Sequence, residues 1–328
     1  MAAIDQTLDT DAKPATDRPA PVARRFRVLI NRGGGTMLAQ GVDTVRDKLQ
    51  SVFDAAGIDA DLHFVAGAEL RPMAEAARED ARAGRLDAVV VGGGDGSVST
   101  VAGVMADSGV TMGVLPVGTL NHFAGDVGMP ADIEAAARAL TTAEIRSVDV
   151  GEVNGRIFIN NSVIGAYPYM VIDRERRREM HGLGKWPAMA LAFGRLLWRF
   201  PRRRLTLCLE GQAKPYRTPL LFIGVNEYSF DYLKPHRAGT MDAGELWLLV
   251  ARVQGPIGLV RLVTRAAFIG LDGARDFNVM KVRGLEIRLR ASRVPVAFDG
   301  EVEIMQGPLK VRIRPGALRV LAPPATPG

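Results

Sequence analysis

Apolar and polar positions alternate along the first half of the chain in a way that predicts strands and helices in turn. Short apolar runs of strand length lie at 26–31, 86–91 and 110–115, and ADLHFVA at 60–66 predicts a further strand. Apolar residues recur at helical spacing over 42–56, 69–83, 98–106 and 132–140. The run at 86–91, LDAVVV, is typical of a parallel strand covered by helices on both faces. This half therefore predicts an open α/β sheet whose ligands bind at the carboxyl ends of the strands.

From about residue 146 the pattern changes to short runs with a period of two, bounded by turn residues. Leu285, Ile287 and Leu289 show this alternation, as do Val311 and Ile313. The second half therefore predicts antiparallel β structure, either a sandwich or a flattened barrel. Helical spacing interrupts it over roughly 185–200 and 256–270.

The composition is that of a globular protein, because 47% of the 328 residues are hydrophobic. No apolar run approaches the ~18 residues needed to span a bilayer, and residues 1–24 lack the apolar stretch of a secretory signal. We expect 1–24 and 323–328 to be disordered tails and the protein to be cytoplasmic. The single cysteine, Cys208, excludes an intrachain disulfide. Four scattered histidines argue against a zinc site.

Glycines gather where predicted strands end. Gly33-Gly34-Gly35 follows the strand at 26–31, and the sequence GGGDGS at 92–97 follows the strand at 86–91. Glycine lets backbone N–H groups converge on an anion, and a helix that starts there adds a partial positive charge. The pattern predicts a phosphate-binding loop, with Ser97 or Ser99 as the helix N-cap. A tight strand–helix turn without a ligand is the alternative.

Four segments together resemble the diacylglycerol kinase catalytic domain family, which includes sphingosine kinases and bacterial lipid kinases. The family carries GGDGT and PxGTxND motifs, which match GGGDGS and the PVGTLN segment at 116–121. An upstream loop matches 31–35, and a late DGE motif matches Asp299-Gly300-Glu301. Alone, Asp-Gly-Glu would predict only a hairpin turn. The resemblance implies a Rossmann-like ATP-binding domain at 25–147, an antiparallel β-sandwich domain for the lipid at 148–322, and an active site between them.

The resemblance implies an enzyme of phospholipid metabolism that uses ATP and Mg²⁺ to phosphorylate a hydroxyl of a diacylglycerol-like or sphingoid-like lipid. Glu301 matches the family's general base, and Asp299 would place Glu301 or the metal. Asp95 and Asp242 are the expected metal ligands. The expected contacts with the nucleotide are Asn31, Arg32, Gly33, Gly34, Gly35, Gly93, Gly94, Asp95, Gly96, Ser97, Val98, Ser99, Thr100, Gly118, Thr119 and Asn121.

Three positions depart from the family's pattern. Ser97 replaces the usual Thr and keeps its hydroxyl group, whereas His122 stands where the family usually has Asp and so removes a carboxylate. Ala243 falls where bacterial members have a carboxylate ligand of a structural Mg²⁺, and Asp242 lies one residue away. The first change is conservative; the other two put a metal contact in doubt.

One segment makes the chain basic. The net charge is +6, and residues 174–204 alone contain ten Lys or Arg and two Glu. Within them, 185–204 predicts a basic amphipathic helix, which suits the surface of an anionic membrane, where each nearby cation adds roughly 1 kcal/mol. The alternative is that its apolar stripe packs on the β domain while the arginines face water. The segment does not show the pattern of aromatic residues interleaved along a basic groove that nucleic-acid binding calls for, so we expect no nucleic-acid partner.

Two other functions remain open from the sequence. NAD kinases share a GGDG-type loop, although PVGTLN and the late DGE follow the lipid-kinase pattern. A non-catalytic, nucleotide-responsive membrane-binding protein would account for His122 and Ala243. The retention of Glu301 and of the whole glycine loop favours an enzyme.

Overall fold

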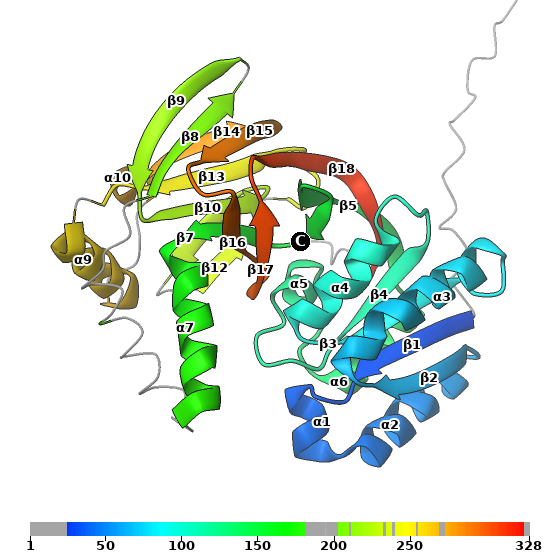
Figure 1. Cartoon of the computed structure of the whole chain (residues 1–328). Helices are drawn as coiled ribbons and strands as arrows, with labels where there is room; N and C mark the ends of the chain where they lie inside the picture. The colour runs from blue at the N-terminus through cyan, green and yellow to red at the C-terminus, as the bar shows by residue number, and fades with distance from the viewer. Residues whose placement is uncertain are drawn as a thin grey trace, which may run out of the picture.

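The computed structural model describes residues 25–181, 194, 203–209, 211–231, 234–237, 240–253, 255–268 and 273–324. Figure 1 shows an N-terminal α/β lobe (blue to cyan-green) beside a C-terminal lobe built mainly of strands. The expected fold class is therefore confirmed. The basic helix expected over roughly 185–200 lies outside the described residues, apart from Gly194.

The N-terminal lobe contains a parallel sheet in the order β2-β1-β3-β4. Every residue of β3 and β4 is buried, as the apolar run at 86–91 predicts. The strands span Arg25–Asn31 (β1), Asp59–Val65 (β2), Ala88–Gly93 (β3) and Thr111–Pro116 (β4). All four expected strands are confirmed to within a few residues.

Helices cover both faces of this sheet, with α3 packing beside α4 and α2 beside α6 (Figure 1). Four of the helices were expected from their apolar spacing, whereas α1 and α5 were not, because they are only one or two turns long. The helices are Gly35–Gln40 (α1), Val42–Ala55 (α2), Gly67–Glu69 (η1, a 3₁₀ turn), Leu70–Arg82 (α3), Asp95–Met105 (α4), His122–Asp126 (α5) and Ile133–Thr141 (α6).

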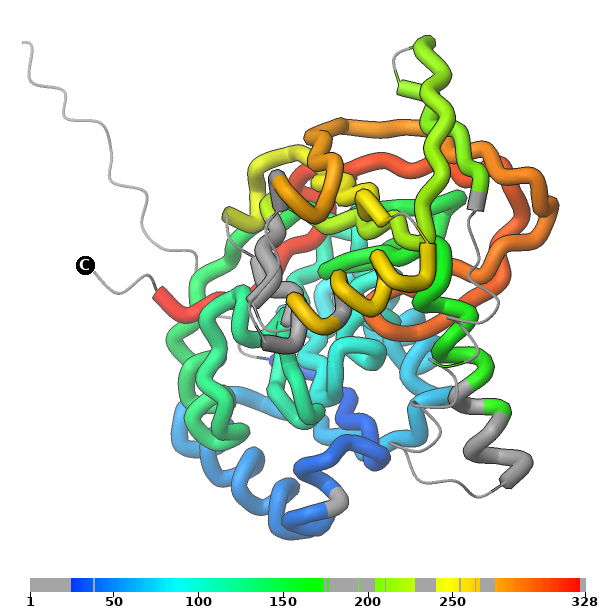
Figure 2. The backbone as a smooth tube through the Cα atoms, turned by 90° about the vertical axis from the view of Figure 1, so that its left-hand side faces the viewer, coloured from blue at the N-terminus to red at the C-terminus, as the bar shows by residue number. Residues whose placement is uncertain are grey.

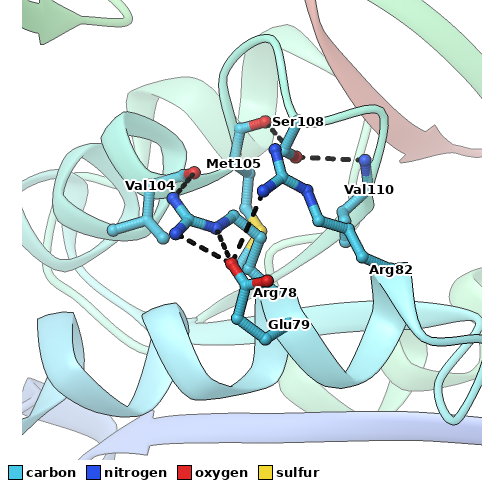
Figure 3. Close-up of polar contacts among 7 residues, drawn as sticks. All are labelled: Arg78, Glu79, Arg82, Val104, Met105, Ser108 and Val110. Carbon is cyan, nitrogen blue, oxygen red and sulfur yellow. Dashed lines mark hydrogen bonds and ion pairs between the residues drawn. The ribbon is translucent and has the colours of Figure 1, made fainter.

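The carboxyl end of α4 is held by α3 and by the turn that follows (Figure 3). Arg78 Nη1 donates to the carbonyl of Val104, one of the carbonyls that a helix end leaves without an internal partner. Ser108 Oγ donates to the carbonyl of Met105 at 2.5 Å and accepts the N–H of Val110 at 3.1 Å. These contacts fix the far end of the helix whose other end forms the glycine loop.

The C-terminal lobe is a sandwich of two antiparallel layers. One layer is β14-β13-β10-β7-β16-β17, and the other is the β18-β15-β8-β9 part of the long sheet. Leu207 and Ile287 from the second layer share a buried core with Ile223 and Phe298 from the first. Figures 1 and 2 both show the β8–β9 hairpin (yellow-green) standing out from the rest of the lobe.

The elements of this lobe match the β-rich pattern expected from residue 146 onward. Helix α9 corresponds to the segment expected at 256–270, and its Leu259 packs on the outer face of the first layer. The bounds are Glu144–Val153 (β5), Arg156–Phe158 (β6), Asn161–Gly165 (β7), Ala166–His181 (α7), Arg203–Leu209 (β8), Gln212–Thr218 (β9), Leu220–Val225 (β10), Tyr228–Asp231 (β11), Lys234–Arg237 (β12), Leu246–Ala251 (β13), Gly255–Phe268 (α9), Gly273–Asp276 (α10), Phe277–Val282 (β14), Gly284–Leu289 (β15), Arg293–Phe298 (β16), Glu301–Gln306 (β17) and Leu309–Ala322 (β18).

Strand β18 belongs to both lobes (Figure 1). Its first part pairs with β15, and its last part pairs in parallel with β4 through Arg319 and Val320. β5 pairs antiparallel with β18 along most of its length. Leu318 and Leu321 accordingly lie in the N-terminal core. The domain boundary that we expect between residues 147 and 148 stays a prediction. Strand β18 crosses between the two cores.

A cluster of charged side chains joins the lobes beside β18. Glu152 on β5 accepts hydrogen bonds from Arg312 at 2.8 Å and from Arg314 at 2.6 Å, and Arg314 also pairs with Asp107 at the end of α4. The Glu152 side chain is only 10% exposed. Burial alone would raise its pKa, but the two guanidinium groups together hold the pKa of Glu152 below its ordinary value.

Replacing Glu152 with Gln is expected to lower the free energy of unfolding at pH 7 by about 2 kcal/mol, because two guanidinium groups lose a charged partner. The pKa of Glu152 is lower in the folded chain, so its contribution is present above about pH 4.3 and is lost as the pH falls through the folded value. Urea unfolding at several pH values measures this. Glu286→Gln, which breaks the exposed pair with Arg288, is the control and should cost less than about 1 kcal/mol. A Glu152→Gln deficit that grows below pH 4 would contradict the assignment.

Candidate active site between the two lobes

The glycine loop passes directly from β3 into α4. The N-cap of α4 is Gly94, which has extended backbone, and no side chain caps the helix. The expected N-cap role of Ser97 or Ser99 was therefore wrong, because the helix starts at Asp95 and both serines lie within it. The first N–H groups of a helix have no partner inside it, so the first turn of α4 offers donors to an anion.

Three glycine-containing loops meet at the carboxyl edge of the parallel sheet. A Cβ on Gly118 would lie 2.3 Å from Gly94 Cα, and one on Gly34 would lie 3.0 Å from the carbonyl oxygen of Val117. Thr36 N donates to that same carbonyl at 3.1 Å. The loops after β1, β3 and β4 are thus in backbone contact, which only residues without a side chain permit. Such a surface can approach phosphate groups closely.

Asn31 ties the first loop to the second. Its Nδ2 donates to Ser97 Oγ at 2.8 Å, while its Oδ1 accepts the N–H of Gly33 at 2.9 Å. A Cβ on Gly93 would lie 2.4 Å from Ser97 Cβ, so β3 and the first turn of α4 are equally tightly packed. The hydroxyl group that Ser97 keeps in place of the family's Thr therefore has a defined role in holding the loops together.

Asp95 holds the third loop by binding the start of α5. Its Oδ2 accepts the backbone N–H of His122 at 3.3 Å, and its Oδ1 accepts that of Phe123 at 3.1 Å. Asn121, with φ of 53°, accepts the N–H of Gly118 and donates to its carbonyl, both at 2.9 Å. The contact with position 122 uses a backbone N–H, so the change from Asp to His leaves it intact.

Glu301 reaches this site from the other lobe. A Cβ on Gly96 would lie only 2.2 Å from Glu301 Oε1 and 2.9 Å from its Cδ, so the carboxylate rests against the glycine. On the same face of β17, Glu303 Oε1 accepts a hydrogen bond from Arg156 Nε at 2.7 Å. The structure thus brings together two segments that are about 200 residues apart in sequence, as a site between the domains requires.

Asp299 occupies the turn before Glu301 and is surrounded by donors. Its Oδ2 accepts Ser99 Oγ–H at 2.6 Å and the N–H of Ile159 at 3.0 Å, and its Oδ1 accepts the N–H groups of Asn160 at 2.8 Å and Asn161 at 3.0 Å. Burial raises the pKa of the Asp299 carboxyl, against the four hydrogen bonds, which favour its ionised form. The hairpin turn expected for Asp-Gly is confirmed, since Phe298 pairs with Glu301.

The remaining residues that were expected to contact the nucleotide lie in different surroundings. Arg32 is exposed beside Glu69, and Thr119 is exposed next to Gly35. Val98 is buried in the core and its N–H bonds the carbonyl of Gly94, so it supports the helix. Thr100 Oγ1 donates to the carbonyl of Gly96 at 2.9 Å, inside α4.

The two expected metal ligands lie in different surroundings. Each carboxylate oxygen of Asp95 accepts one hydrogen bond and keeps a lone pair for a cation. Asp242 is exposed, in a loop anchored through Gly244 N to the buried carboxylate of Asp149 at 2.7 Å. Among the described residues, no three His, Cys, Asp or Glu side chains group to form a metal cage. Asp95 fits Mg²⁺ that is held largely by phosphates, as is usual for this ion.

The sequence did not reveal the segment that binds Asp299. Ile159, Asn160 and Asn161 contribute only backbone N–H groups, so their side chains carry no signature of the contact. The partnership of Ser99 with Asp299 was missed for another reason: the two residues are 200 positions apart. The sequence therefore offered no signal for either contact.

Replacing Gly118 with Ala is expected to weaken nucleotide binding strongly, since the new methyl group would collide with the backbone of Gly94, which cannot move as a side chain can. Binding of a fluorescent ATP analogue should weaken by at least about 100-fold, about 2.7 kcal/mol. Gly125→Ala in α5 is the matched control, because a Cβ there meets nothing within 4 Å. Unchanged affinity in Gly118→Ala would show that the loops do not need this approach.

Comparison with known proteins agrees with this geometry. A model of the diacylglycerol kinase catalytic domain family matches residues 25–153. A Bacillus subtilis (strain 168) protein named diacylglycerol kinase is 37% identical over 142 residues, which are 42% of this chain and 44% of that protein. The matched part thus spans less than half of that relative.

Similarity also extends beyond residues 25–153. A Pseudomonas aeruginosa protein named probable lipid kinase YegS-like is 28% identical over 278 residues, covering 76% of this chain and 81% of that protein. A crystal structure of a putative diacylglycerol kinase from Bacillus anthracis superposes with a TM-score of 0.70 at 22% identity, covering 92% of this chain and 98% of that one. The two lobes of this chain therefore occur together in a known fold.

Proposed function

We propose that this protein is an ATP-dependent lipid kinase in which Glu301 takes the proton from a hydroxyl group of the lipid. The observation that carries the proposal is the contact of the Glu301 carboxylate with Gly96. It puts a carboxylate from one lobe against the glycine loop of the other. A phosphoryl-transfer enzyme needs a base beside the phosphate site and little further covalent chemistry.

The loops support ATP as the phosphate donor. Three glycine-containing turns converge with the N–H groups at the start of α4. A Cβ at Gly34, Gly93 or Gly118 would fill the space between them. ATP supplies the γ-phosphoryl group, and Mg²⁺ bound with it would neutralise charge next to Asp95. Asn31, Ser97 and Asn121 hold the loops in register through the hydrogen bonds described above.

Glu301 accepts the hydroxyl proton as the lipid oxygen forms its bond to the γ-phosphorus and ADP departs with the electrons of the broken phosphoanhydride bond. Asp299 keeps the turn before Glu301 fixed through its four hydrogen bonds. Arg156 holds Glu303 on the same face of β17, so the neighbouring carboxylate is engaged elsewhere. Glu301 is therefore the base in this proposal.

A cavity of about 340 Å³ supports a lipid as the acceptor. It opens between the layers of the sandwich, at the end of β16 opposite the Asp299–Gly300 turn, roughly 16 Å along the strand. Most of its lining side chains are apolar, as an acyl chain requires. The lining residues are Ile164, Gly165, Tyr169, Arg204, Leu289, Arg290, Ala291 and Val294.

Peripheral contact with an anionic membrane through 185–204 also belongs to this proposal, although most of that segment lies outside the described residues. Helices α7 and α9 support it, because each exposes an apolar side chain together with a cation. Ile172 and Arg176 are exposed on α7, and Ile257, which is 85% exposed, and Arg261 are exposed on α9. Within the described residues, no helix is long and apolar enough to cross a membrane. Contact of this kind is typical of amphipathic surfaces that carry cations.

The test is a transfer assay with γ-phosphate-labelled ATP and Mg²⁺. Vesicles containing phosphatidylglycerol with diacylglycerol, a sphingoid base or neither are offered in parallel, and NAD is offered in a separate reaction. We expect label in the organic phase with at least one lipid. Label on NAD alone would replace the proposal with a NAD kinase, and absence of label on every acceptor would favour a non-catalytic, nucleotide-responsive protein.

A further inference from the structure

One face of α4 makes the direct contacts between the glycine loop and the second lobe. Gly96, Ser99 and Gly103 follow one another at spacings of three and four residues, so they lie along one side of the helix. Gly96 faces Glu301, Ser99 donates to Asp299, and Gly103 faces Arg156. The helix that starts at the phosphate loop therefore also sets where the second lobe sits.

Ser99 is the donor that crosses between the lobes at Asp299. Three of the four hydrogen bonds to this carboxylate come from the backbone of 159–161, in the same lobe as Asp299, and the fourth comes from Ser99. Ser99 is 1% exposed, and its hydroxyl lies 2.6 Å from Asp299 Oδ2. In the described part of the chain, this is the hydrogen bond between side chains that links α4 to the Asp299–Glu301 turn.

The turn transmits the position of Asp299 to Glu301. Asp299 and Gly300 have φ of 49° and 94°, the left-handed backbone of a two-residue hairpin turn, and Glu301 is the first residue of the following strand. Such a turn is stiff, because few other backbone conformations join two strands in two residues. A shift of the Asp299 carboxylate would therefore move the Glu301 carboxylate relative to Gly96.

We propose that Ser99 is a positioning residue that acts through Asp299 to hold the Glu301 carboxylate over the glycine loop, and that it does not bind the nucleotide. The inference rests on the proposed function, because it assigns Ser99 to the proton-transfer step of that reaction. It differs from what the family resemblance implies, which places Ser99 among the ATP contacts. Because its one proton is given to Asp299, the hydroxyl cannot also donate to a phosphate oxygen of the nucleotide.

Steady-state kinetics of Ser99→Ala separate the two roles. The variant keeps the buried shape but removes the donor, and we expect kcat for lipid phosphorylation to fall about 10- to 100-fold, the cost of a small misplacement of a reacting group. The KM for ATP and the dissociation constant of a non-hydrolysable ATP analogue should stay within about twofold of wild type. A raised KM for ATP with unchanged kcat would instead make Ser99 a nucleotide ligand and overturn the proposal.

A double variant shows whether Ser99 acts through Glu301. In a Glu301→Gln background, Ser99→Ala should lower the residual rate by less than about twofold, because the group that Ser99 positions is already inactive. A substitution that merely destabilises the protein would lower the rate by the same factor in the wild-type and Glu301→Gln backgrounds, and that result would refute the proposal. If Ser99→Ala does not fold, Ser99→Cys, which offers a weaker donor of similar shape, carries the same comparison.

The outcomes for the two proposals differ. A wild-type protein that labels no lipid refutes the proposed function and this inference with it. An active wild type whose kcat is unchanged in Ser99→Ala refutes only the role of Ser99.

Discussion

Replacement of Glu301 by Gln is expected to lower kcat for lipid phosphorylation by about 10²- to 10⁴-fold, the usual contribution of a positioned general base. The amide keeps the size of the side chain and its place against Gly96, but it cannot accept the hydroxyl proton. The KM for ATP should change little, since the glycine loop is built from the other lobe. Initial rates at saturating ATP, with labelled lipid as the product, measure the effect.

Glu303→Gln is the matched control for Glu301→Gln. It removes a carboxylate two residues further along the same face of β17, where Glu303 is paired with Arg156 at 2.7 Å. We expect its kcat to stay within about fivefold of wild type, because an ion pair whose carboxylate side chain is 43% exposed contributes on the order of 1 kcal/mol and its loss does not touch the base. Equal losses in the two variants would mean that β17 is merely perturbed and that Glu301 has no chemical role.

Gly96→Ala is expected to lower kcat almost as much as Glu301→Gln does, although it leaves the Glu301 side chain itself unchanged. The new Cβ would lie 2.2 Å from Glu301 Oε1, a distance that no pair of such atoms tolerates, so the carboxylate must move away. Because the end of a glutamate side chain is flexible, the fold should adapt while the reaction loses its base. We expect kcat to fall at least about 100-fold and thermal stability to change by no more than a few degrees.

The neighbouring Gly103 provides the control for Gly96. It lies on the same face of α4, but a Cβ there would meet nothing closer than 3.7 Å. Gly103→Ala should therefore stabilise the helix by up to about 1 kcal/mol and leave kcat unchanged. If Gly96→Ala were as active as Gly103→Ala, then the contact of Glu301 with the loop would not be the catalytic arrangement.

The sequence predicted the N-terminal fold well because its signals are local. The strands β1, β3 and β4 are largely buried runs, and each longer helix buries one stripe, as Val45, Leu49 and Phe53 do in α2. The short helices α1 and α5 were missed because they are too short for a periodic pattern, and α5 is stabilised by Asp95, which lies 28 residues before Phe123. Interactions at that distance leave no periodic trace in the sequence.

The same distinction explains what was predicted of the site. The glycine loops, Glu301 and Asp299 stand out because glycine clusters and motif spacing are visible in a single chain. The contact of Glu301 with Gly96 depends instead on how two lobes pack. The expected N-cap failed for a related reason, since Ser97 and Ser99 bond Asn31 and Asp299, which tertiary packing alone brings near. The local preference for serine as an N-cap predicted bonds to the helix backbone, whereas the actual partners of both serines are side chains distant in sequence.

The shared strand β18 has a consequence for how the protein is made. The parallel part of the N-terminal sheet ends at β4, whose outer edge is paired by β18, and Arg319 Nη1 reaches back 210 residues to the carbonyl of Gly109. During synthesis, residues 25–153 leave the ribosome long before that partner exists, so β4 presents an unpaired apolar edge in the meantime. A ribosome-bound nascent chain should therefore acquire protease resistance in one late step rather than domain by domain.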